Sequence, residues 1–401
     1  MSRLTRRQFV TGAAALGAAM SRGRALAANA QAGTAQAQGR KGRVYPDQRR
    51  RFTDPKSGRT IWQLTNAGAA TTKLYFTNRS VTPDSRWLIY HSDRGSAPEH
   101  FNLFKMDLRT GESIQLTESG GVTEDTPEIS YDGKQVYYGE NEHSVKSVDL
   151  ESLQERTLCR FDDPIHFDHA FTITPDGRSL IVPAFIEPPK KLGYNFGHYT
   201  RRDALIVVNT ANGEQRRLID GNTPLGHVAI CPTNGSLVLF SLHVHWAEIQ
   251  RPWLINMDGT GHRMIFRQAQ GEGAGHELWG ASGRTIYLTC YGGRQPEGLW
   301  AVNVDGTNER SVLRGPNIAH SCVNPEEDRF VVDELLTDTT SLWMAKKGSN
   351  EPEFLHKMSA DWFAPRDGVL ETTPFHPHPR FLPNGTGLVF NSGGEMYLIE
   401  M

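Results

Sequence analysis

The sequence lacks most of the features that mark redox, nucleic-acid-binding and membrane proteins. No C-x-x-C pair occurs, so a structural zinc site on cysteine and a disulfide framework are both disfavoured. The formal net charge is only −2, which gives no electrostatic case for binding nucleic acid. Beyond the N-terminus, no apolar run approaches the roughly 20 residues of a membrane span. The four cysteines are scattered as Cys159, Cys231, Cys290 and Cys322.

Long helical patterns are also scarce. The 39 glycines and 22 prolines instead favour a β-rich chain with many turns. About 370 residues remain after the N-terminal segment, which is ordinary for a repeat architecture that closes on itself.

The first 27 residues are typical of an export signal. "TRRQFV" (Thr5 to Val10) is a twin-arginine pattern, followed by the small and apolar stretch "VTGAAALGAAM" and by Ala25-Leu26-Ala27 as a cleavage site. We therefore expect export to the periplasm or beyond through the twin-arginine translocase. Residues 28–45 are of low complexity and are expected to form a flexible linker, and residues 46–401 are expected to form the folded domain.

One short pattern recurs through the domain. An apolar pair is followed by Pro-Asp-Gly or a relative and then by an apolar run, which predicts a strand, a tight turn and a strand. The seven copies are "VTPDSRWLIY" at 81, "ISYDGKQVYY" at 129, "ITPDGRSLIV" at 173, "ICPTNGSLVLF" at 230, "WGASGRTIYL" at 279, "VNPEEDRFVV" at 323 and "FLPNGTGLVF" at 381. Most are followed by a second hairpin, such as "LFKMDLRTGESIQLT". The pattern predicts an all-β fold, a seven-bladed β-propeller of four-stranded blades.

The seventh unit ends early, at "GEMYLIEM". Its missing outer strand is predicted to be "GRTIWQLT" (Gly58 to Thr65), which looks like the end of a unit without a beginning. A strand from the N-terminus would close the ring and remove an exposed edge. The alternative, an open array of hairpins, would leave long unpaired edges.

Histidines fall at one structural position in four consecutive units. Counted five residues back from the proline of the first turn, or from its equivalent Ala281, they are His227, His276, His320 and His378. The first three units carry Asn78, Thr126 and Ala170 there. This position opens the innermost strand, which lines the central channel, so the four imidazoles should converge on the axis. His376 lies two residues before His378, and strand alternation points it to the same side.

Such histidines could instead make hydrogen bonds within each blade. That interpretation predicts histidines in all seven blades and leaves His376 unexplained, so a metal or catalytic cluster is favoured. Asp168 shares the register of His376 and is a weaker candidate. Other histidines are expected at the surface or outside this register: His166, His169, His243, His245 and His262.

The segments "QGEGAGHELW", "AHSC", "FHPHPRF", "LGH" and "RPWLINMDGT" resemble those of oligogalacturonate lyases, over most of the mature chain. The resemblance implies a seven-bladed propeller that binds a divalent metal, most often manganese, and cleaves short galacturonides by β-elimination. It also implies that His227 is the catalytic base. By the same resemblance, the metal ligands are His276, His320, His376 and His378.

Two departures from the family pattern accompany the resemblance. The family has a glutamine ligand where this chain has Thr373, and Glu371 is the nearby residue that could replace it. The familiar members are also cytoplasmic, whereas this chain carries an export signal. An arginine for a substrate carboxylate is expected in "TRRDAL", at Arg201 or Arg202.

The chemistry expected for such a site is the removal of a proton α to a carboxylate. A divalent cation on the carboxylate stabilises the enolate-like intermediate, and a neutral histidine suits the role of base near pH 7. Imidazole ligands favour Mn, Fe, Ni or Zn over Ca or Mg. Two other functions stay open at this point, a lyase acting on another uronate polymer and a non-catalytic periplasmic propeller of the TolB type that serves as a binding scaffold.

Overall fold

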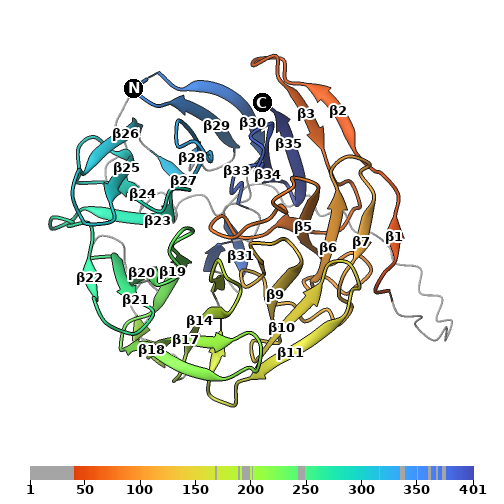
Figure 1. Ribbon diagram of the computed structural model, residues 1–401. Helices are drawn as coiled ribbons and strands as arrows, with labels where there is room; N and C mark the ends of the chain where they lie inside the picture. Colours follow the sequence, from red (N-terminus) through yellow and green to blue (C-terminus); the bar gives the residue numbers. More distant parts are fainter. Residues whose placement is uncertain are drawn as a thin grey trace. The chain divides into compact units, whose positions relative to one another are not determined.

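The strand–turn–strand repeats form seven antiparallel sheets around one axis, as the computed structural model shows (Figure 1). The predicted seven-bladed propeller is confirmed, and no α-helix occurs among the described residues. No helix in this part of the chain is long and apolar enough to cross a membrane. The structure describes residues 40–167, 169–187, 190–191, 199–200, 202–242, 249–315, 317–334, 339–349, 351–359, 363–366, 369–372 and 376–401, with the backbone alone for 190–191, 199–200, 359, 363–366 and 369–372.

Each blade runs outward from an inner strand, and consecutive strands pair through short turns. Blade 1 contains β4 (Thr71–Lys73), β5 (Trp87–Ser92), β6 (Asn102–Asp107), β7 (Ser113–Gln115) and β1 (Val44–Tyr45). Blade 2 contains β8 (Glu128–Ile129), β9 (Gln135–Glu140), β10 (Ser144–Asp149) and β11 (Glu155–Arg160). Blade 3 contains β12 (His166–Phe167) and β13 (Thr172–Ile173), which both pair with β14 (Ser179–Phe185), and then β17 (Asp203–Asn209) and β18 (Gln215–Gly221).

The other four blades follow the same order. Blade 4 contains β19 (Leu225–Ile230), β20 (Leu237–Leu242), β21 (Pro252–Asn256) and β22 (Arg263–Met264). Blade 5 contains β23 (Gly273–Trp279), β24 (Thr285–Tyr291), β25 (Gly298–Asn303) and β26 (Arg310–Arg314). Blade 6 contains β27 (Ile318–Val323), β28 (Arg329–Glu334), β29 (Thr339–Lys346) and β30 (Glu353–Ser359). Blade 7 contains β33 (Arg380–Phe381), β34 (Gly387–Ser392), β35 (Glu395–Glu400), β3 (Thr60–Gln63) and β2 (Arg50–Thr53).

Two short hairpins lie outside the blades. One pairs β15 (Lys190–Lys191) with β16 (Tyr199–Thr200), and the other pairs β31 (Phe363–Arg366) with β32 (Val369–Thr372).

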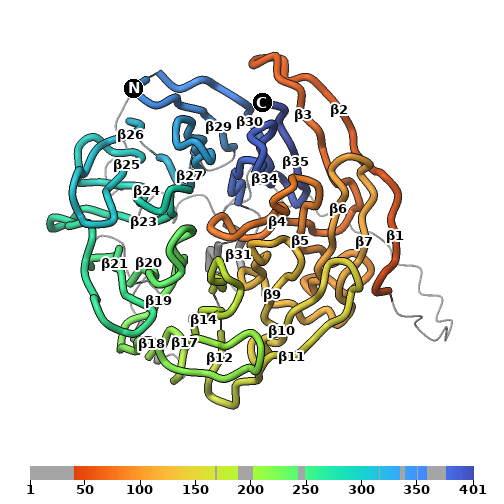
Figure 2. The backbone as a smooth tube through the Cα atoms, in the orientation of Figure 1, coloured from red at the N-terminus to blue at the C-terminus, as the bar shows by residue number. Residues whose placement is uncertain are grey.

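The predicted closure of the ring is confirmed. β3 pairs antiparallel with β35, so that Ile61 lies opposite Ile399, and the strand from the start of the domain lies beside the last strand of the chain (Figure 2). β2 adds a fifth strand outside β3, which the sequence pattern did not predict. Blade 7 is therefore built from both ends of the folded chain, and its inner edge is left to face the axis.

The expected boundary of the linker at residue 45 is too late. β1 already pairs with β7, and the backbone N–H of Gly42 donates to the carbonyl of Gln115 at 2.8 Å. Antiparallel pairing with the outer strand of blade 1 holds this segment, so the folded unit begins at Arg40. The predicted signal, residues 1–27, and the rest of the predicted linker lie outside the described residues, as do Asp168, Arg201, His243, His245 and Thr373.

Apolar side chains are buried between neighbouring blades. Seven clusters of buried hydrophobic residues are present among the described residues, one at each blade-to-blade interface. The cluster between blades 6 and 7 includes Ile61, Leu342, Leu388 and Ile399, each fully buried. Burial of apolar surface on both faces of every sheet explains why most second strands are buried along nearly their whole length.

Candidate functional site

The inner strand is interrupted in blades 1 to 6 at the position where the histidines fall. In blades 4, 5 and 6 the pairing register shifts there, between Gly226 and Ala229, between Gly275 and Leu278, and between Ile318 and Ser321. In blade 3 the strand divides into β12 and β13, and in blades 1 and 2 an isolated bridge stands apart from the short inner strand. These bulges release the residue at the break from the ladder, so that its side chain is free to turn toward the axis.

The backbone of three of these histidines is left-handed. The φ angles are 49° for His227, 52° for His276 and 44° for His378. A residue other than glycine in this region costs about 1–3 kcal/mol, and such strain is concentrated at functional sites. The repeated conformation indicates that these positions are shaped to present an imidazole rather than to complete the sheet.

The five histidines predicted to ring the axis come together. Ring centroids are separated by 5.6 Å for His227 and His276, by 4.3 Å for His276 and His320, and by 4.3 Å for His320 and His378. The centroid of His376 lies 5.5 Å from that of His320 and 5.4 Å from that of His378. Residues from four blades therefore form one continuous cluster.

An aromatic side chain that the sequence analysis missed lies among these imidazoles. The ring centroid of Phe76 is between 5.1 and 5.8 Å from the centroids of His227, His276, His320 and His378. Phe76 stands two residues before Asn78, the same offset that His376 has from His378. The register that identified His376 could therefore have identified Phe76, which gives the cluster an apolar wall and helps to exclude water.

Three of the imidazoles are within reach of a single metal ion. Donor atoms of His320, His376 and His378 lie within 4.8 Å of one another. The ring of His276 lies against that of His320 at a tilt of 46°, but His276 is not one of this closest group. The predicted set of four is thus brought together, with three side chains in the tightest arrangement.

In two of these histidines, His276 and His320, Nδ1 makes a hydrogen bond, which leaves Nε2 available to bind a metal. Nδ1 of His320 faces Oδ2 of the buried Asp333 at 3.0 Å, and Nδ1 of His276 faces the carbonyl of Ala319 at 2.7 Å. Both rings therefore offer Nε2 toward the cluster. Nε2 of His378 is buried without a hydrogen-bond partner in the described structure, which a bound cation would resolve.

This arrangement fits a divalent transition metal. Imidazole nitrogens suit transition metals such as Fe, Ni or Zn better than Ca or Mg. Partners such as Asp333 and the Ala319 carbonyl fix the tautomer and the orientation of ligating rings. Burial also lowers the pKa of His276, His320 and His378 well below the ordinary value, with His320 adding to the effect at His276 and His378. The rings are therefore neutral near pH 7, as metal ligands must be.

His227 has a different partner from the other histidines. Its Nδ1 lies 2.9 Å from Oε2 of Glu277, which is fully buried, and its Nε2 lies 3.1 Å from the hydroxyl of Tyr75. Burial alone would raise the pKa of Glu277, but Arg251 and His227 outweigh it and hold that pKa below its usual range. Glu277 is therefore an ionised carboxylate that can only accept, so Nδ1 carries the proton and Nε2 presents its lone pair.

The pKa of His227 is lowered by its burial, and Glu277 offsets this only in part. The imidazole is consequently neutral near pH 7 and able to take a proton. A carboxylate behind a neutral histidine is the usual arrangement of a general base, because the carboxylate holds the tautomer and stabilises the imidazolium that forms.

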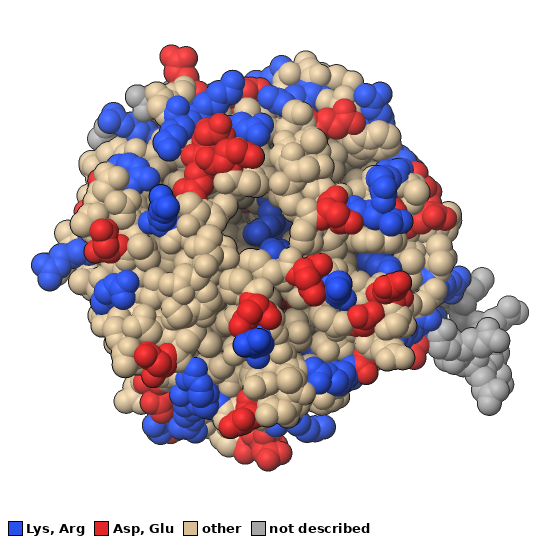
Figure 3. All heavy atoms as spheres, viewed as in Figure 1, with Lys and Arg blue, Asp and Glu red and all other residues tan. Residues whose placement is uncertain are grey.

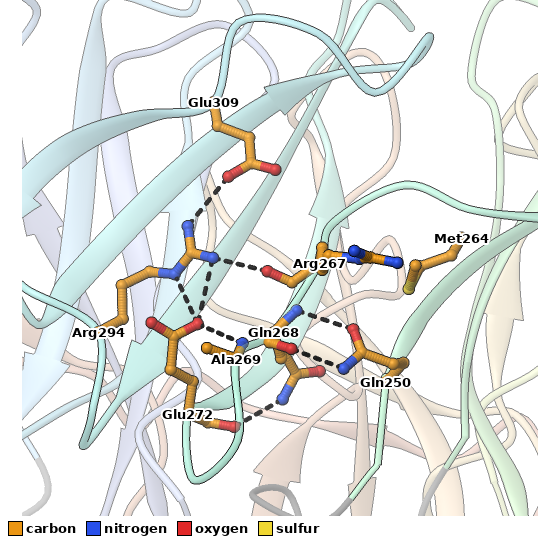
Figure 4. Close-up of a pocket in the computed structure, with 8 residues that line it drawn as sticks. All are labelled: Gln250, Met264, Arg267, Gln268, Ala269, Glu272, Arg294 and Glu309. Atoms are coloured by element: carbon orange, nitrogen blue, oxygen red, sulfur yellow. Dashed lines mark hydrogen bonds and ion pairs between the residues drawn. The ribbon is translucent and has the colours of Figure 1, made fainter.

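Arg251 is a second residue that the sequence analysis missed. It is buried, and its Nε lies 3.6 Å from Oε1 of Glu277. Gln250, the residue before Arg251, lines a pocket of about 680 Å³ together with residues of blades 4 and 5 (Figure 4). There the side chain of Gln268 accepts from the backbone N–H of Arg251 at 2.8 Å, and Gln250 bonds the backbone of Gln268 on both sides. These bonds fix the backbone that carries Arg251.

Arg202, predicted to bind a substrate carboxylate, lies at the start of β17 outside the histidine cluster. Its guanidinium pairs with Asp220 at 2.9 Å and with Glu187 at 3.5 Å, and it is half-exposed. Its role in binding stays a prediction, as does that of Arg201, which is outside the described residues. The side chain of Glu371 is also not described, so the residue that replaces the glutamine of the family pattern is not identified.

The fold and the site together define a propeller with a central cluster of imidazoles suited to a metal and a carboxylate-paired histidine beside it. The sequence profile of the oligogalacturonate lyase family matches residues 40–339. The chain belongs to the oligogalacturonate lyase family.

Relatives at low identity match along nearly their whole length. The oligogalacturonate lyase of Dickeya dadantii (strain 3937) is 22% identical over 362 residues, which cover 85% of this chain and 92% of that protein. The oligogalacturonide lyase of Pectobacterium atrosepticum is 23% identical over 374 residues, which cover 88% of this chain and 95% of that protein.

Two solved structures also match this chain over nearly their whole length. The crystal structure of oligogalacturonate lyase from Vibrio parahaemolyticus superposes with a TM-score of 0.80 at 25% identity, covering 90% of this chain and 98% of that one. An oligogalacturonate lyase in complex with manganese superposes with the same TM-score at 22% identity and the same coverage. The propeller fold is thus the fold of these relatives.

Proposed function

We propose that this protein is a metal-dependent polysaccharide lyase that cleaves short 4-linked galacturonides, the fragments of pectin, by β-elimination. The observation that carries the proposal is the pairing of two arrangements at one end of the axis. One is a group of neutral, buried imidazoles suited to a divalent cation, and the other is a neutral histidine backed by an ionised carboxylate. Membership of the oligogalacturonate lyase family supports the same chemistry.

Manganese is the proposed cation, in keeping with the related lyase that was solved in complex with it. His276, His320, His376 and His378 would hold the ion. A divalent cation supplies Lewis acidity, because it neutralises a uronate carboxylate and makes the proton on the adjacent carbon more acidic.

His227 then acts as the base. The C5 proton of the sugar passes to Nε2, a double bond forms between C4 and C5, and the bond from C4 to the bridging oxygen breaks, with that oxygen taking up a proton from water to leave as a hydroxyl. Glu277 stabilises the imidazolium that results. The hydroxyl of Tyr75 lies 3.1 Å from this Nε2 and is therefore next to the atom that would take the proton.

The distribution of basic side chains is consistent with a negatively charged substrate. The face seen in Figure 3 is hollowed at its centre, and Lys or Arg side chains lie within the hollow. A basic hollow favours ligands that carry several carboxylates, as galacturonides do.

Export through the twin-arginine translocase to the periplasm or beyond is also part of the proposal. It rests on "TRRQFV" and on the small-residue cleavage site that follows. That route carries folded proteins, so the metal could be loaded before the protein meets copper and zinc, which compete more strongly for imidazole sites.

The test is an assay of the purified mature protein with Mn²⁺ against a panel of uronate oligomers. We expect ultraviolet absorbance from an unsaturated uronide with galacturonides, and its loss after treatment with a chelator. Product from a different uronate alone would assign the lyase to another polymer. Saturable binding without any product would instead identify a binding scaffold.

A further inference from the structure

A second group of metal-type side chains lies between blades 2 and 3. His143, Asp163 and His166 each present one donor atom, and these atoms lie within 4.8 Å of one another. His143 is the last residue of the turn between β9 and β10, Asp163 lies between β11 and β12, and His166 is the first residue of β12. We propose that these three side chains form a second site for a divalent transition metal, which joins blade 2 to blade 3.

The spacing of the donors is that of ligands around one ion. Nε2 of His143 lies 3.6 Å from Oδ1 of Asp163, and Nε2 of His166 lies 3.5 Å from the same oxygen. Ligands held at the usual distances from a tetrahedral zinc ion are about 3.4 Å apart. Both separations exceed the length of an ordinary N–H···O hydrogen bond, so direct hydrogen bonds do not account for two imidazoles gathered at one carboxylate oxygen.

The two imidazoles are held in place by their surroundings. The ring of His166 stacks on that of Phe185 with centroids 5.0 Å apart, and its Nδ1 lies 3.5 Å from Oε2 of Glu142. That separation is too long for a hydrogen bond, and Nδ1 of His166 is buried without a hydrogen-bond partner among the described residues. Nδ1 of His143 is buried without a hydrogen-bond partner among the described residues. The ring of His143 packs against that of His166, with centroids 4.1 Å apart.

The conformation of the turn that carries His143 brings this residue close to blade 3. Asn141 and Glu142 have φ angles of 51° and 60°. Two left-handed residues in succession make a tight hairpin whose twist matches the strands. The turn therefore directs Glu142 and His143 toward blade 3, where Asp163 and His166 lie.

The donor set selects the class of metal. Two imidazoles and one carboxylate suit Zn²⁺, Co²⁺, Ni²⁺ or Cu²⁺ better than Ca²⁺ or Mg²⁺. The side chain of Asp163 is 86% exposed, so water can complete the coordination from the solvent side. The site is independent of the axial cluster and of the lyase activity, since it shares no residue with either.

Co²⁺ is the probe for the first test, because its visible absorption reports tetrahedral coordination. The protein used is the full mature chain with His376→Ala and His378→Ala, which disable the axial site. We expect one equivalent of Co²⁺ to give visible bands that Zn²⁺ displaces. Adding Asp163→Asn should weaken this binding at least tenfold, and this exposed residue can change without unfolding the chain.

Asp162→Asn is the matched control, since it removes the same charge one residue away and Asp162 is also exposed. It should leave the Co²⁺ spectrum and affinity unchanged. Equal binding by the Asp163→Asn and Asp162→Asn proteins, or no Co²⁺ bands in either, would overturn the proposal.

A second readout uses the otherwise unmodified protein. An ion that binds only the folded chain raises its Tm. Zn²⁺ added to the manganese-loaded enzyme should raise Tm, and this rise should be lost in His143→Ala but kept in His100→Ala, which changes an exposed histidine of blade 1. A rise of equal size in both variants would show that the stabilising ion binds elsewhere.

Discussion

The pairing of Glu277 with His227 gives the sharpest test of the proposed base. The change is Glu277→Gln, which keeps the size of the side chain and removes its charge. In the proposed reaction His227 becomes an imidazolium next to a carboxylate whose oxygen lies 2.9 Å from Nδ1. Two unit charges about 4 Å apart at an effective dielectric constant of about 20 attract by about 4 kcal/mol.

That energy corresponds to a rate factor of about 10³. Arg251 also lies near the Glu277 carboxylate and already neutralises part of its charge, so the attraction between Glu277 and the imidazolium is weaker than this value. We therefore expect kcat/KM to fall by about 10²–10³, as measured by the ultraviolet absorbance of the unsaturated product. Because Glu277 raises the pKa of His227, the acidic limb of the pH profile should also move to lower pH.

Metal content and Tm are measured on the same preparations, because the buried Arg251 loses its ion pair with Glu277 and the variant should be less stable. Glu327→Gln is the control. It makes the same chemical change at a carboxylate that accepts from Tyr287 at 3.0 Å, away from the axis, and should keep parent activity. A folded, metal-loaded Glu277→Gln protein with parent turnover and an unmoved acidic limb would refute the assignment of His227 as base.

Four further outcomes are expected. His378→Ala should lower the bound metal and the activity together, with only a small change in Tm, as measured by elemental analysis, the lyase assay and thermal unfolding. If the variant binds as much metal as the parent, the histidine cluster has a structural role. His227→Ala should keep its metal, and its turnover should fall by about 10²–10⁴-fold. In the parent protein, activity should be lost on acidification only below pH 6.5, because burial lowers the pKa of His227. Ile61→Ala, which empties a fully buried position in blade 7, should lower the free energy of unfolding by about 2–5 kcal/mol in a denaturant titration. Arg6→Lys combined with Arg7→Lys should retain the protein inside the cell on fractionation, and normal export would contradict the proposed route.

The repeated turn motif made both the fold and the histidine cluster predictable. Each Pro-Asp-Gly type turn marks the same point of a blade, so a residue counted back from it has a known place near the axis. This is why His227, His276 and His320 could be aligned although they lie more than 40 residues apart. The same count places Phe76 at the position of His376, although Phe76 is aromatic and not a histidine.

The residues that contact these histidines could not be found by counting back from the turn. Glu277 is next to His276 in the chain but serves His227 in the neighbouring blade, because adjacent residues of a strand point to opposite sides. Asp333 and Arg251 reach the site from second and third strands, where no sequence pattern distinguishes them from ordinary polar positions. β1 and β2 were missed for a similar reason, since short edge strands with few apolar residues carry little periodic signal.

The closure of blade 7 has a consequence for biosynthesis. β3 ends at Gln63 and its partner β35 begins at Glu395, so the ribosome must add more than 300 residues before the two can pair. At about 5–20 residues per second, β3 waits about 20–70 s for its partner. During that time Ile61 has no neighbour from the end of the chain to bury it. The ring can therefore close only after β35 has been made, and a chain that stops before β35 leaves β2 and β3 without the strand that they pair with.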